Sequence, residues 1–325
     1  MAYLVTSSRV FPAATPNADP TIPATVRAAF APPCPLSAAQ QYTRRLALGH
    51  YENFSVLSAL LPRRLRQHFA NVYAFCRTAD DLGDEVGDKS LALQYLSRFK
   101  DFTRACYAGD KRSPLFVALS ETIRQFDIPI DPFLDLIDAF EQDQHVSRYE
   151  NFGQVVDYCH RSADPVGRLV LYMCGYRDTE RQVLSDRTCT ALQLANFWQD
   201  VRRDIIERDR IYIPADSMHR FGVDEDQLRN GHCNDNYRNL IQFEVDRTEK
   251  LFEEGQALLP MLEPTVRRQV SLFGQGGRAV LQAIRRQNYD TLSKRPSISK
   301  MQKSRLVIRA LVTGVASRFD RRSRA

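Results

Sequence analysis

Carboxylate pairs occur at two places in this 325-residue sequence. Asp80 and Asp84 form the first pair, and Asp200 and Asp204 form the second. Each pair is spaced four residues apart within a run of helical apolar periodicity, so both carboxylates project from one helix face. Like charges placed in this way repel by about 0.2–0.5 kcal/mol on an exposed helix, and by more where water is scarce. The two pairs therefore indicate a bound cation.

Oxygen ligands extend the second pair, because Asn196 lies four residues before Asp200. Mg²⁺ prefers such hard ligands and typically uses one or two carboxylates, with water and phosphate oxygens completing its shell. No Cys or His lies at helical spacing beside either pair, which disfavours soft metals. The pattern predicts Mg²⁺ at Asp80, Asp84, Asn196, Asp200 and Asp204, and with it polyphosphate chemistry. The alternative is that each cluster is a solvated helix face.

Several neighbours of the pairs could bind substrate. Arg77 lies on the face of Asp80 and Asp84, where it either binds a diphosphate or pairs with the aspartates. Tyr73, Phe54 and Tyr289 are candidates for lining an apolar pocket or steadying a cation. Periodicity alone favours a core position for these three aromatic residues.

The elements that must position these residues are helices. From Leu36 onward long segments follow the helical period, and no extended alternation predicts strands. We expect a single all-α domain over residues 36–303, between a disordered Pro/Ala-rich leader at 1–35 and a basic C-terminal helix and tail at 304–325. The predicted helices cover 37–49, 53–60, 63–84, 90–107, 113–125, 131–141, 151–159, 164–174, 179–204, 234–257, 262–288 and 299–317.

Charge and composition exclude several classes of protein. The net charge of +6 is concentrated in residues 294–325, which carry ten Lys/Arg against one acid and leave −3 for residues 1–293. Nucleic-acid binding is therefore not expected. No apolar run of membrane-spanning length or secretory signal is present, and the seven cysteines are scattered, so we expect a cytoplasmic protein. The basic, amphipathic tail helix either packs on the domain or contacts a membrane surface.

A glycine-rich run, Gly274-Gln-Gly276-Gly-Arg-Ala279, formally fits a dinucleotide-binding motif. No strand is predicted before it, so this interpretation fails its structural condition and a turn entering a helix is favoured.

Two longer motifs resemble the squalene/phytoene synthase family. The first runs from His50-Tyr51-Glu-Asn53-Phe54 to Val72-Tyr73-Ala-Phe-Cys-Arg77-Thr-Ala-Asp80-Asp81-Leu-Gly-Asp84-Glu85. The second is Gln193-Leu-Ala-Asn196-Phe-Trp-Gln-Asp200-Val-Arg-Arg-Asp204, followed by Arg210-Ile-Tyr-Ile-Pro214. The likeness covers about residues 40–303.

This resemblance implies an all-α, single-domain isoprenoid synthase (class I terpenoid synthase) fold with a central apolar tunnel. It implies two or three Mg²⁺ ions held by the two aspartate motifs. By position it assigns Tyr73, Arg77 and Tyr289 to the catalytic centre. It assigns substrate contacts to the following residues: His50, Tyr51, Phe54, Asp81 and Gln193.

One branch of the family is indicated by a further motif, Ser162-Ala-Asp-Pro-Val-Gly167-Arg168. It resembles the hydroxysqualene-forming members of bacterial hopanoid biosynthesis, in which presqualene diphosphate and water give hydroxysqualene and diphosphate. Gly167 and Arg168 would then contact substrate, Asn53 and Tyr51 would hold the water, and NADPH is not expected. Position 199 carries Gln where many members have Arg.

Two other functions stay open. One is head-to-head condensation of two prenyl diphosphates to squalene, presqualene diphosphate or a phytoene-type product. The other is a non-catalytic helical scaffold that binds proteins, for instance enzymes of the same pathway.

Overall fold

The computed structural model describes residues 22–49 and 62–298. Within these ranges the chain is helical and contains no strand, which confirms the all-α prediction. The α-helices and one 3₁₀ helix, η2, have these bounds: α1 Ala24–Ala29, α2 Leu36–Gly49, α4 Arg63–Asp84, α5 Lys89–Tyr107, α6 Pro114–Phe126, α7 Asp131–Gln142, α8 Phe152–Ser162, α9 Asp164–Met173, α10 Thr179–Arg208, α11 Ala215–Phe221, α12 Glu225–Asn230, α13 Asp235–Gly255, η2 Gln256–Met261 and α14 Pro264–Arg286.

Local sequence sets the ends of the helices that carry the carboxylate pairs. α4 begins after Pro62, whose fixed φ suits the residue before a first turn. α10 begins where the Asp178 side chain accepts a hydrogen bond from the Arg181 amide, and it ends at Asp209 with a left-handed φ of 51°. The Arg210 amide then donates to the carbonyl of Asp204 over 3.1 Å, as is usual for such a helix ending. This ending turns the residues after α10 back toward α4.

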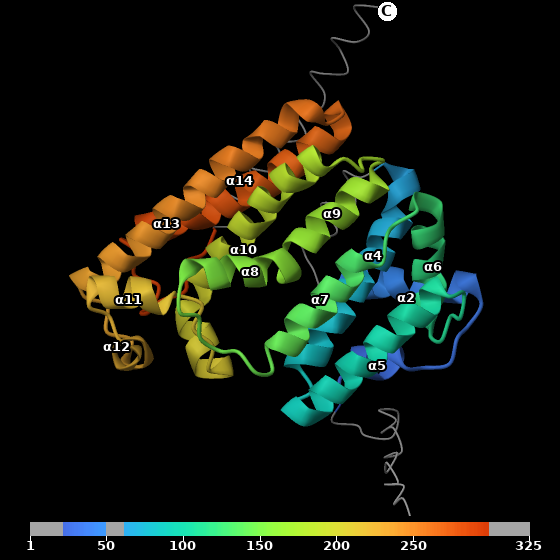
Figure 1. Cartoon of the computed structure of the whole chain (residues 1–325), viewed down its shortest axis with the longest axis horizontal. Helices are drawn as coiled ribbons and strands as arrows, with labels where there is room; N and C mark the ends of the chain where they lie inside the picture. The colour runs from blue at the N-terminus through green and yellow to red at the C-terminus, as the bar shows by residue number, and fades with distance from the viewer. Residues whose placement is uncertain (1–21, 50–61, 299–325) are drawn as a thin grey trace, which may run out of the picture.

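Two large hydrophobic cores, beside two smaller clusters, hold the described residues 22–49 and 62–298 together. One is built mainly from α8, α10, α13 and the loops around α11, with Trp198 and Tyr237 among its fully buried side chains. The other is built mainly from α1, α2 and α4–α7, with Phe75, Phe99 and Phe133 at its centre. Figure 1 shows α10, α13 and α14 running side by side on one side of the molecule, and α2 and α4–α7 on the other. α4, with the first pair, and α10, with the second, thus belong to different cores.

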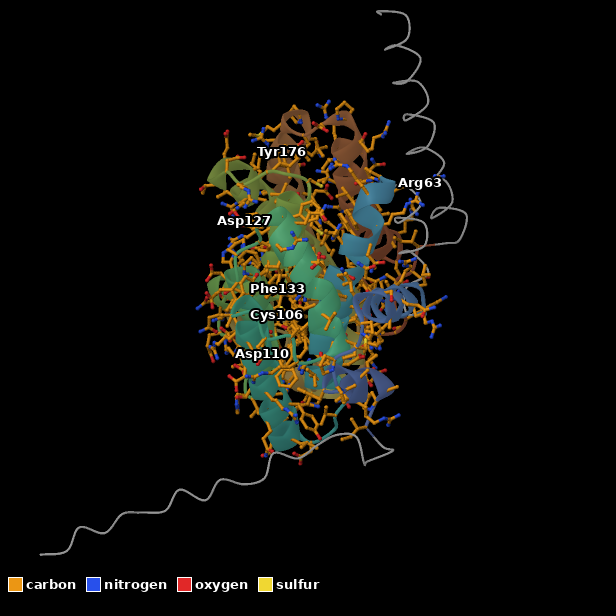
Figure 2. All side chains as sticks on the ribbon, turned by 90° about the vertical axis from the view of Figure 1, so that its right-hand side faces the viewer. Arg63, Cys106, Asp110, Asp127, Phe133 and Tyr176 are labelled. Atoms are coloured by element: carbon orange, nitrogen blue, oxygen red, sulfur yellow. The ribbon has the colours of Figure 1, made fainter. Side chains whose placement is uncertain are left out.

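Figure 2 shows the second core from its outer side, with Cys106 of α5 and Phe133 of α7 among the side chains between the helices. Both residues are buried. All seven cysteines are free, as their spacing predicts.

The segment at 22–35 differs from the prediction of a disordered leader. α1 lies there and packs on α4 and α6, with Ile22, Val26 and Phe30 buried in the second core. The Thr25 hydroxyl also donates to the Asp81 carboxylate. Disorder is therefore the wrong prediction for this part, because its few apolar residues share one face. The composition, rich in Pro and Ala, conceals that face.

Three other expectations can be compared with the structure. The glycine-rich run lies inside the continuous helix α14, so the predicted turn is wrong and no strand precedes it. The short helices α11 and α12 were not predicted. The helices expected at 53–60 and 299–317 lie outside the described residues. Over the described part of the chain, no helix is both long enough and apolar enough to span a membrane.

Candidate active site

The first carboxylate pair lies on a less buried stripe of α4. Tyr73, Arg77, Asp80 and Asp84 are all partly buried, whereas the residues between them, such as Phe75, are buried in the core. Arg77 donates to Asp80 over 3.2 Å, so the helix face carries a cation among its anions. Tyr73 is close enough for its charge state to influence the pKa of Arg77. Arg77, Asp80 and Asp84 share one face of α4, as their spacing predicts, and their predicted roles at a site stay predictions.

Asp81 has partners within the protein, and its predicted contact with substrate stays a prediction. Its side chain is 3 % exposed and is engaged by Arg77, and it accepts the hydrogen bond from Thr25 of α1. In this position Asp81 is a structural residue that ties α1 and Arg77 to the first motif.

The second pair lies on a corresponding stripe of α10. Gln193, Asp200 and Asp204 are partly buried and Asn196 is exposed, while Trp198 and Val201 on the other face are buried. Beside the stripe, the ring of Phe197 stacks on that of Tyr212 with centroids 3.7 Å apart. The four candidate residues of the second motif therefore share one side of α10, at the edge of the first core.

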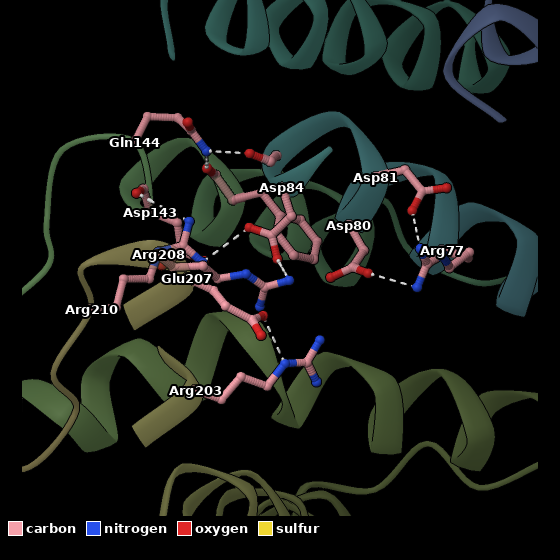
Figure 3. Close-up of polar contacts among 12 residues, drawn as sticks. Arg77, Asp80, Asp81, Asp84, Asp143, Gln144, Arg203, Glu207, Arg208 and Arg210 are labelled. Atoms are coloured by element: carbon pink, nitrogen blue, oxygen red, sulfur yellow. Dashed lines mark hydrogen bonds and ion pairs between the residues drawn. The ribbon is translucent and has the colours of Figure 1, made fainter. Parts of the chain in front are cut away.

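Arginines that follow the second motif reach across to the first. Arg208, the last residue of α10, donates to Asp84 Oδ2 over 3.0 Å, and Arg210 donates to Asp84 Oδ1 over 3.0 Å. Arg210 also lies 3.6 Å from a carboxylate oxygen of Asp143, which follows α7. Figure 3 shows these contacts between the end of α4 and the end of α10. The two acidic motifs thus meet through arginine side chains.

Burial and like charge raise the pKa values of three aspartates at this site. The pKa of Asp80 is raised to about 6, chiefly by burial and then by Asp84. That of Asp204 is raised to about 7 by burial and by Asp200. Burial also raises the pKa of Asp143 to about 7, although Arg210 opposes the shift. At Asp80 and Asp204 the surroundings compensate the negative charge only in part, so an additional cation there would lower the pKa of either group.

The donor chemistry of the two stripes fits Mg²⁺. Oxygen atoms that could act as ligands stand at Asp80, Asp84, Asn196, Asp200 and Asp204, and burial raises the pKa values of Asp80 and Asp204. Over residues 22–49 and 62–298, no three His, Cys, Asp or Glu side chains converge on one point. Mg²⁺ does not require such convergence, because water and phosphate oxygens normally complete its shell. Each stripe fits as half of a site that an anionic ligand would join.

Gly167 and Arg168 of α9 face α10 in ways that explain their identities. A side chain at Gly167 would lie 2.4 Å from Ser185 Oγ and 2.5 Å from Cys189 Sγ, so glycine is required for α9 to approach α10. Arg168 donates two hydrogen bonds to Asp186, at 3.1 and 2.7 Å. Both residues have packing or pairing roles here, and their predicted contacts with substrate stay predictions.

The segment after α14 returns to the second motif. Asn288 and Tyr289 have left-handed φ values of 51° and 57°, and Tyr289 packs against the first core. Arg295, further along, pairs with Asp200, and its Nη2 lies 3.0 Å from Oδ2. The predicted role of Tyr289 beside a diphosphate is not tested by these contacts. The contact of Arg295 was not predicted.

Four predicted site residues lie outside the described part of the chain: His50, Tyr51, Asn53 and Phe54. Sequence reasoning also missed Arg208 and Arg295 as partners of the aspartates, and Asp143 as a second partner of Arg210. A weak signal existed for Arg210, which follows the second family motif. Arg208 and Arg295 carry no periodic signal, because each meets its aspartate only through tertiary folding, and Arg295 and Asp200 are 95 residues apart.

The chain is similar to known proteins in both sequence and structure. Residues 48–302 match the family model for squalene/phytoene synthase. The phytoene synthase of Arthrospira platensis is 28% identical over 283 residues, covering 83% of this chain and 92% of its own. That of Thermus thermophilus is 29% identical over 278 residues, covering 86% and 93%.

Two solved structures are similar over most of the chain. The crystal structure of squalene synthase HpnC from Alicyclobacillus acidocaldarius superposes with a TM-score of 0.75 at 46% identity, over 78% of this chain and 96% of that one. A dehydrosqualene synthase in complex with a ligand gives a TM-score of 0.77 at 24% identity, over 86% and 98%. The latter likeness concerns the fold alone.

Proposed function

This chain belongs to the squalene/phytoene synthase family, whose members act on prenyl diphosphates, and we propose that it converts presqualene diphosphate and water to hydroxysqualene and diphosphate. One observation carries the proposal of diphosphate chemistry. Two acidic stripes on α4 and α10 meet through Arg208 and Arg210, so anionic and cationic groups from both motifs surround one region. The choice of presqualene diphosphate follows from the resemblance of residues 162–168 to the hydroxysqualene-forming branch.

The roles of the residues follow from their chemistry. Asp80 and Asp84 on one side, and Asn196, Asp200 and Asp204 on the other, would hold two or three Mg²⁺ ions. Bound there, Mg²⁺ supplies Lewis-acid chemistry that neutralises the leaving diphosphate and weakens its C–O bond. Cationic side chains near the pairs would bind the remaining phosphate oxygens.

Arg77 is the cation best placed for that contact on α4. It lies one helical turn before Asp80, is partly exposed, and already pairs with an anion of the stripe. Arg208 is 35 % exposed and approaches Asp84, the other carboxylate of the first pair, from α10. Arg210 is far more enclosed, at 10 % exposure, so its role is to fix Asp84.

The second half of the reaction needs an apolar space and one held water. The cation left by ionisation rearranges where ring faces such as that of Tyr73 stabilise it without reacting. Asn53 and Tyr51 are our candidates to hold the water that ends the reaction. Asn53→Leu should shift the ratio of hydroxysqualene to hydrocarbon by-products, and an unchanged ratio would remove Asn53 from that role.

Product analysis tests the proposed reaction. Incubation of the protein with presqualene diphosphate and Mg²⁺ in H₂¹⁸O should give hydroxysqualene with ¹⁸O in its hydroxyl group, without NADPH. Incorporation of no label, or a strict need for NADPH, would contradict it.

Head-to-head condensation of two prenyl diphosphates is the alternative function. The similarity to the phytoene synthases of Arthrospira platensis and Thermus thermophilus supports it. It predicts that farnesyl or geranylgeranyl diphosphate alone gives a C30 or C40 product. The remote alternative, a non-catalytic scaffold, predicts no turnover of any prenyl diphosphate.

Substitution of one aspartate in each pair tests the shared site. Asp80→Asn and Asp200→Asn should each lower the rate by at least about 100-fold, because charge stabilisation of a leaving group is lost. Far-ultraviolet circular dichroism should stay unchanged. Asp101→Asn, on the exposed surface of α5, is the matched control and should keep the wild-type rate. Full activity in either test variant, or in excess EDTA, would contradict Mg²⁺ binding at these pairs.

We also propose that the enzyme works in the cytoplasm, with peripheral membrane contact through its basic C-terminal residues. That contact would suit a water-insoluble product. Flotation of the protein with anionic vesicles, before and after removal of residues 304–325, tests it.

A further inference from the structure

The return segment, residues 287–298, is fastened to the rest of the protein along its length. The Tyr237 and Thr291 hydroxyl groups lie 2.6 Å apart, and Leu292 is buried. The Asp290 carboxylate accepts hydrogen bonds from the amides of Leu292 and Ser293, at 3.2 and 2.9 Å. The backbone before Arg295 is therefore fixed against α13.

Arg295, near the end of this segment, binds Asp200 of the second acidic motif through two hydrogen bonds, which together are called the fork. Its Nε donates to Asp200 Oδ1, and its Nη2 donates to Asp200 Oδ2 over 3.0 Å. The same Nη2 lies 3.1 Å from Gln199 Oε1. A bidentate pair of this kind occupies both oxygens of the carboxylate. The fork uses one lone pair of each oxygen and places a positive charge beside them, so a metal cation would compete with it for Asp200.

Gln199 anchors the segment independently of that fork. Its side-chain amide nitrogen donates to the Pro296 carbonyl over 2.6 Å, and its side chain is buried. The backbone at Pro296 is thus attached to α10 even when the guanidinium of Arg295 moves away. An arginine at position 199 could not accept the hydrogen bond from Arg295.

Exposure distinguishes Arg295 from Arg210, which is also fixed on an acidic pair. Arg210 is 10 % exposed and lies between two buried carboxylates, Asp84 and Asp143. Arg295 is 51 % exposed and faces one carboxylate. Its long side chain therefore has solvent to move into, whereas that of Arg210 does not.

We propose that Arg295 is a positioning residue that serves as the counter-ion of Asp200 until a divalent ion replaces it, and that then pairs with the bound diphosphate. This inference rests on the proposed function. The fork neutralises Asp200 when no ion is bound, and it competes with an ion for the same oxygens. Once displaced, the guanidinium stays tethered at Pro296, within reach of an anion held beside Asp200.

Two binding measurements with the full-length protein test the proposal through opposite effects of one variant. Arg295→Gln should bind Mn²⁺ alone more tightly, by about 3–10-fold in electron paramagnetic resonance titration, because the competing cation is gone. The same variant should bind inorganic diphosphate more weakly in saturating Mg²⁺, by about 10-fold or more in calorimetry, because a charge-assisted hydrogen bond is lost.

Arg203→Gln is the matched charge control. Arg203 lies one residue before Asp204, is 52 % exposed and pairs with Glu207 rather than with an aspartate of the stripe. It should change either affinity by no more than about twofold. Arg295→Lys keeps the charge without the fork and should recover part of the diphosphate affinity.

Each other outcome contradicts the inference in a recognisable way. If Arg295→Gln weakens both ligands, Arg295 is only a structural tie. If Arg295→Gln changes neither the Mn²⁺ affinity nor the diphosphate affinity, while Asp200→Asn abolishes Mn²⁺ binding, the metal site at the aspartates is supported and the proposed role of Arg295 is wrong. If the wild-type protein binds neither ligand, the proposed function fails first.

Discussion

Arg210 lies between two carboxylates that burial would otherwise leave without a counter-charge. Asp84 is 7 % exposed and Asp143 is 3 % exposed. The Tyr158 hydroxyl donates to Asp143 over 2.8 Å, so the group is hydrogen-bonded as well as paired. Such networks are costly to break, because removal of one partner leaves buried charge behind. Asp84, one of the proposed Mg²⁺ ligands, is therefore held by a stable structural network.

Arg210→Met should lower the free energy of unfolding by about 3–5 kcal/mol at pH 8, because the buried Asp143 carboxylate would then lack its counter-charge. The loss should be smaller at pH 5.5, because the raised pKa lets Asp143 take up a proton. Urea denaturation measures both values. Arg203→Met, an exposed control, should change stability by less than about 0.5 kcal/mol, and equal losses in the two variants would contradict the network.

Asp204 gives the protein a pH dependence of defined sign. Its folded-state pKa of about 7 exceeds the unfolded value, so the folded protein binds the proton more strongly. Stability from this group is therefore lost as pH rises from about 4 to about 7. Asp204→Asn lacks this loss, so its stability relative to wild type should increase by at least about 1 kcal/mol from pH 5 to pH 8, without divalent ions. A difference that stays constant with pH would exclude the raised pKa.

At the residue scale, the sequence predicted the carboxylate pairs and the nearby Arg77, but not the arginines that reach the aspartates from elsewhere in the chain. The four-residue spacing placed Asp80 with Asp84, and Asn196 with Asp200 and Asp204, on common faces because a helix fixes that geometry. Arg208, Arg210 and Arg295 reach these aspartates through tertiary folding, for which spacing carries no information. Asp81, one residue after Asp80, pairs with Arg77 and Thr25 in the structure, and its predicted contact with substrate stays a prediction.

Helix α14 approaches its neighbours through one glycine but not the next. A Cβ at Gly277 would lie 2.4 Å from Phe252 Cζ and 2.7 Å from Leu192 Cδ2, whereas a Cβ at Gly276 would meet nothing within 4 Å. Phe252 belongs to α13 and Leu192 to α10. Gly277 therefore sets how closely α14 packs beside the helix of the second motif.

Gly277→Ala should lower the stability by about 1–3 kcal/mol, because the new methyl group forces a shift in close-packed side chains. Gly276→Ala should instead raise it by up to about 1 kcal/mol, since alanine is the better helix former. Thermal unfolding of the two variants compares them directly. Equal effects would mean that α14 does not pack as closely as the structure shows.

Helix α1 contributes to the fold although its sequence looks unstructured. Val26 is fully buried and Ala24 is exposed. Val26→Ser should cost about 2 kcal/mol or more, through lost apolar contact and a buried hydroxyl, while Ala24→Ser should be close to neutral. Denaturation midpoints measure the difference. Tolerance of both substitutions would show that α1 is not part of the core.

At the element scale, length decided what could be predicted. Predicted helices such as 63–84, 131–141 and 179–204 agree with α4, α7 and α10 to within four residues, because several turns of apolar period support each. The helices missed, α1, α11 and α12, have 6 or 7 residues and span too few turns to show a period. Their place is fixed by packing on longer helices.

At the scale of the whole molecule, the fold class and the family followed from the sequence, and the division into two cores did not. Helical periodicity reports that a face is buried, not which neighbour buries it. The cores assemble from helices such as α4 with α6, and α10 with α13, that are distant in sequence. The distribution of net charge along the chain, by contrast, is a sum over residues and can be counted directly from the sequence.

The two cores have a consequence for motion. Regions with separate cores open as separate units, and hydrogen exchange of their amides reports each opening. The first pair of aspartates rides on one unit and the second pair on the other. A ligand bound by aspartates of both units links them and opposes their separate opening. Amide hydrogen exchange in α4 and α10 should therefore slow together when Mg²⁺ and diphosphate are added, while α12 keeps its exchange rate. Slowing confined to one helix would mean that the ligand rests on a single half, and that the enzyme need not close on its substrate to hold it.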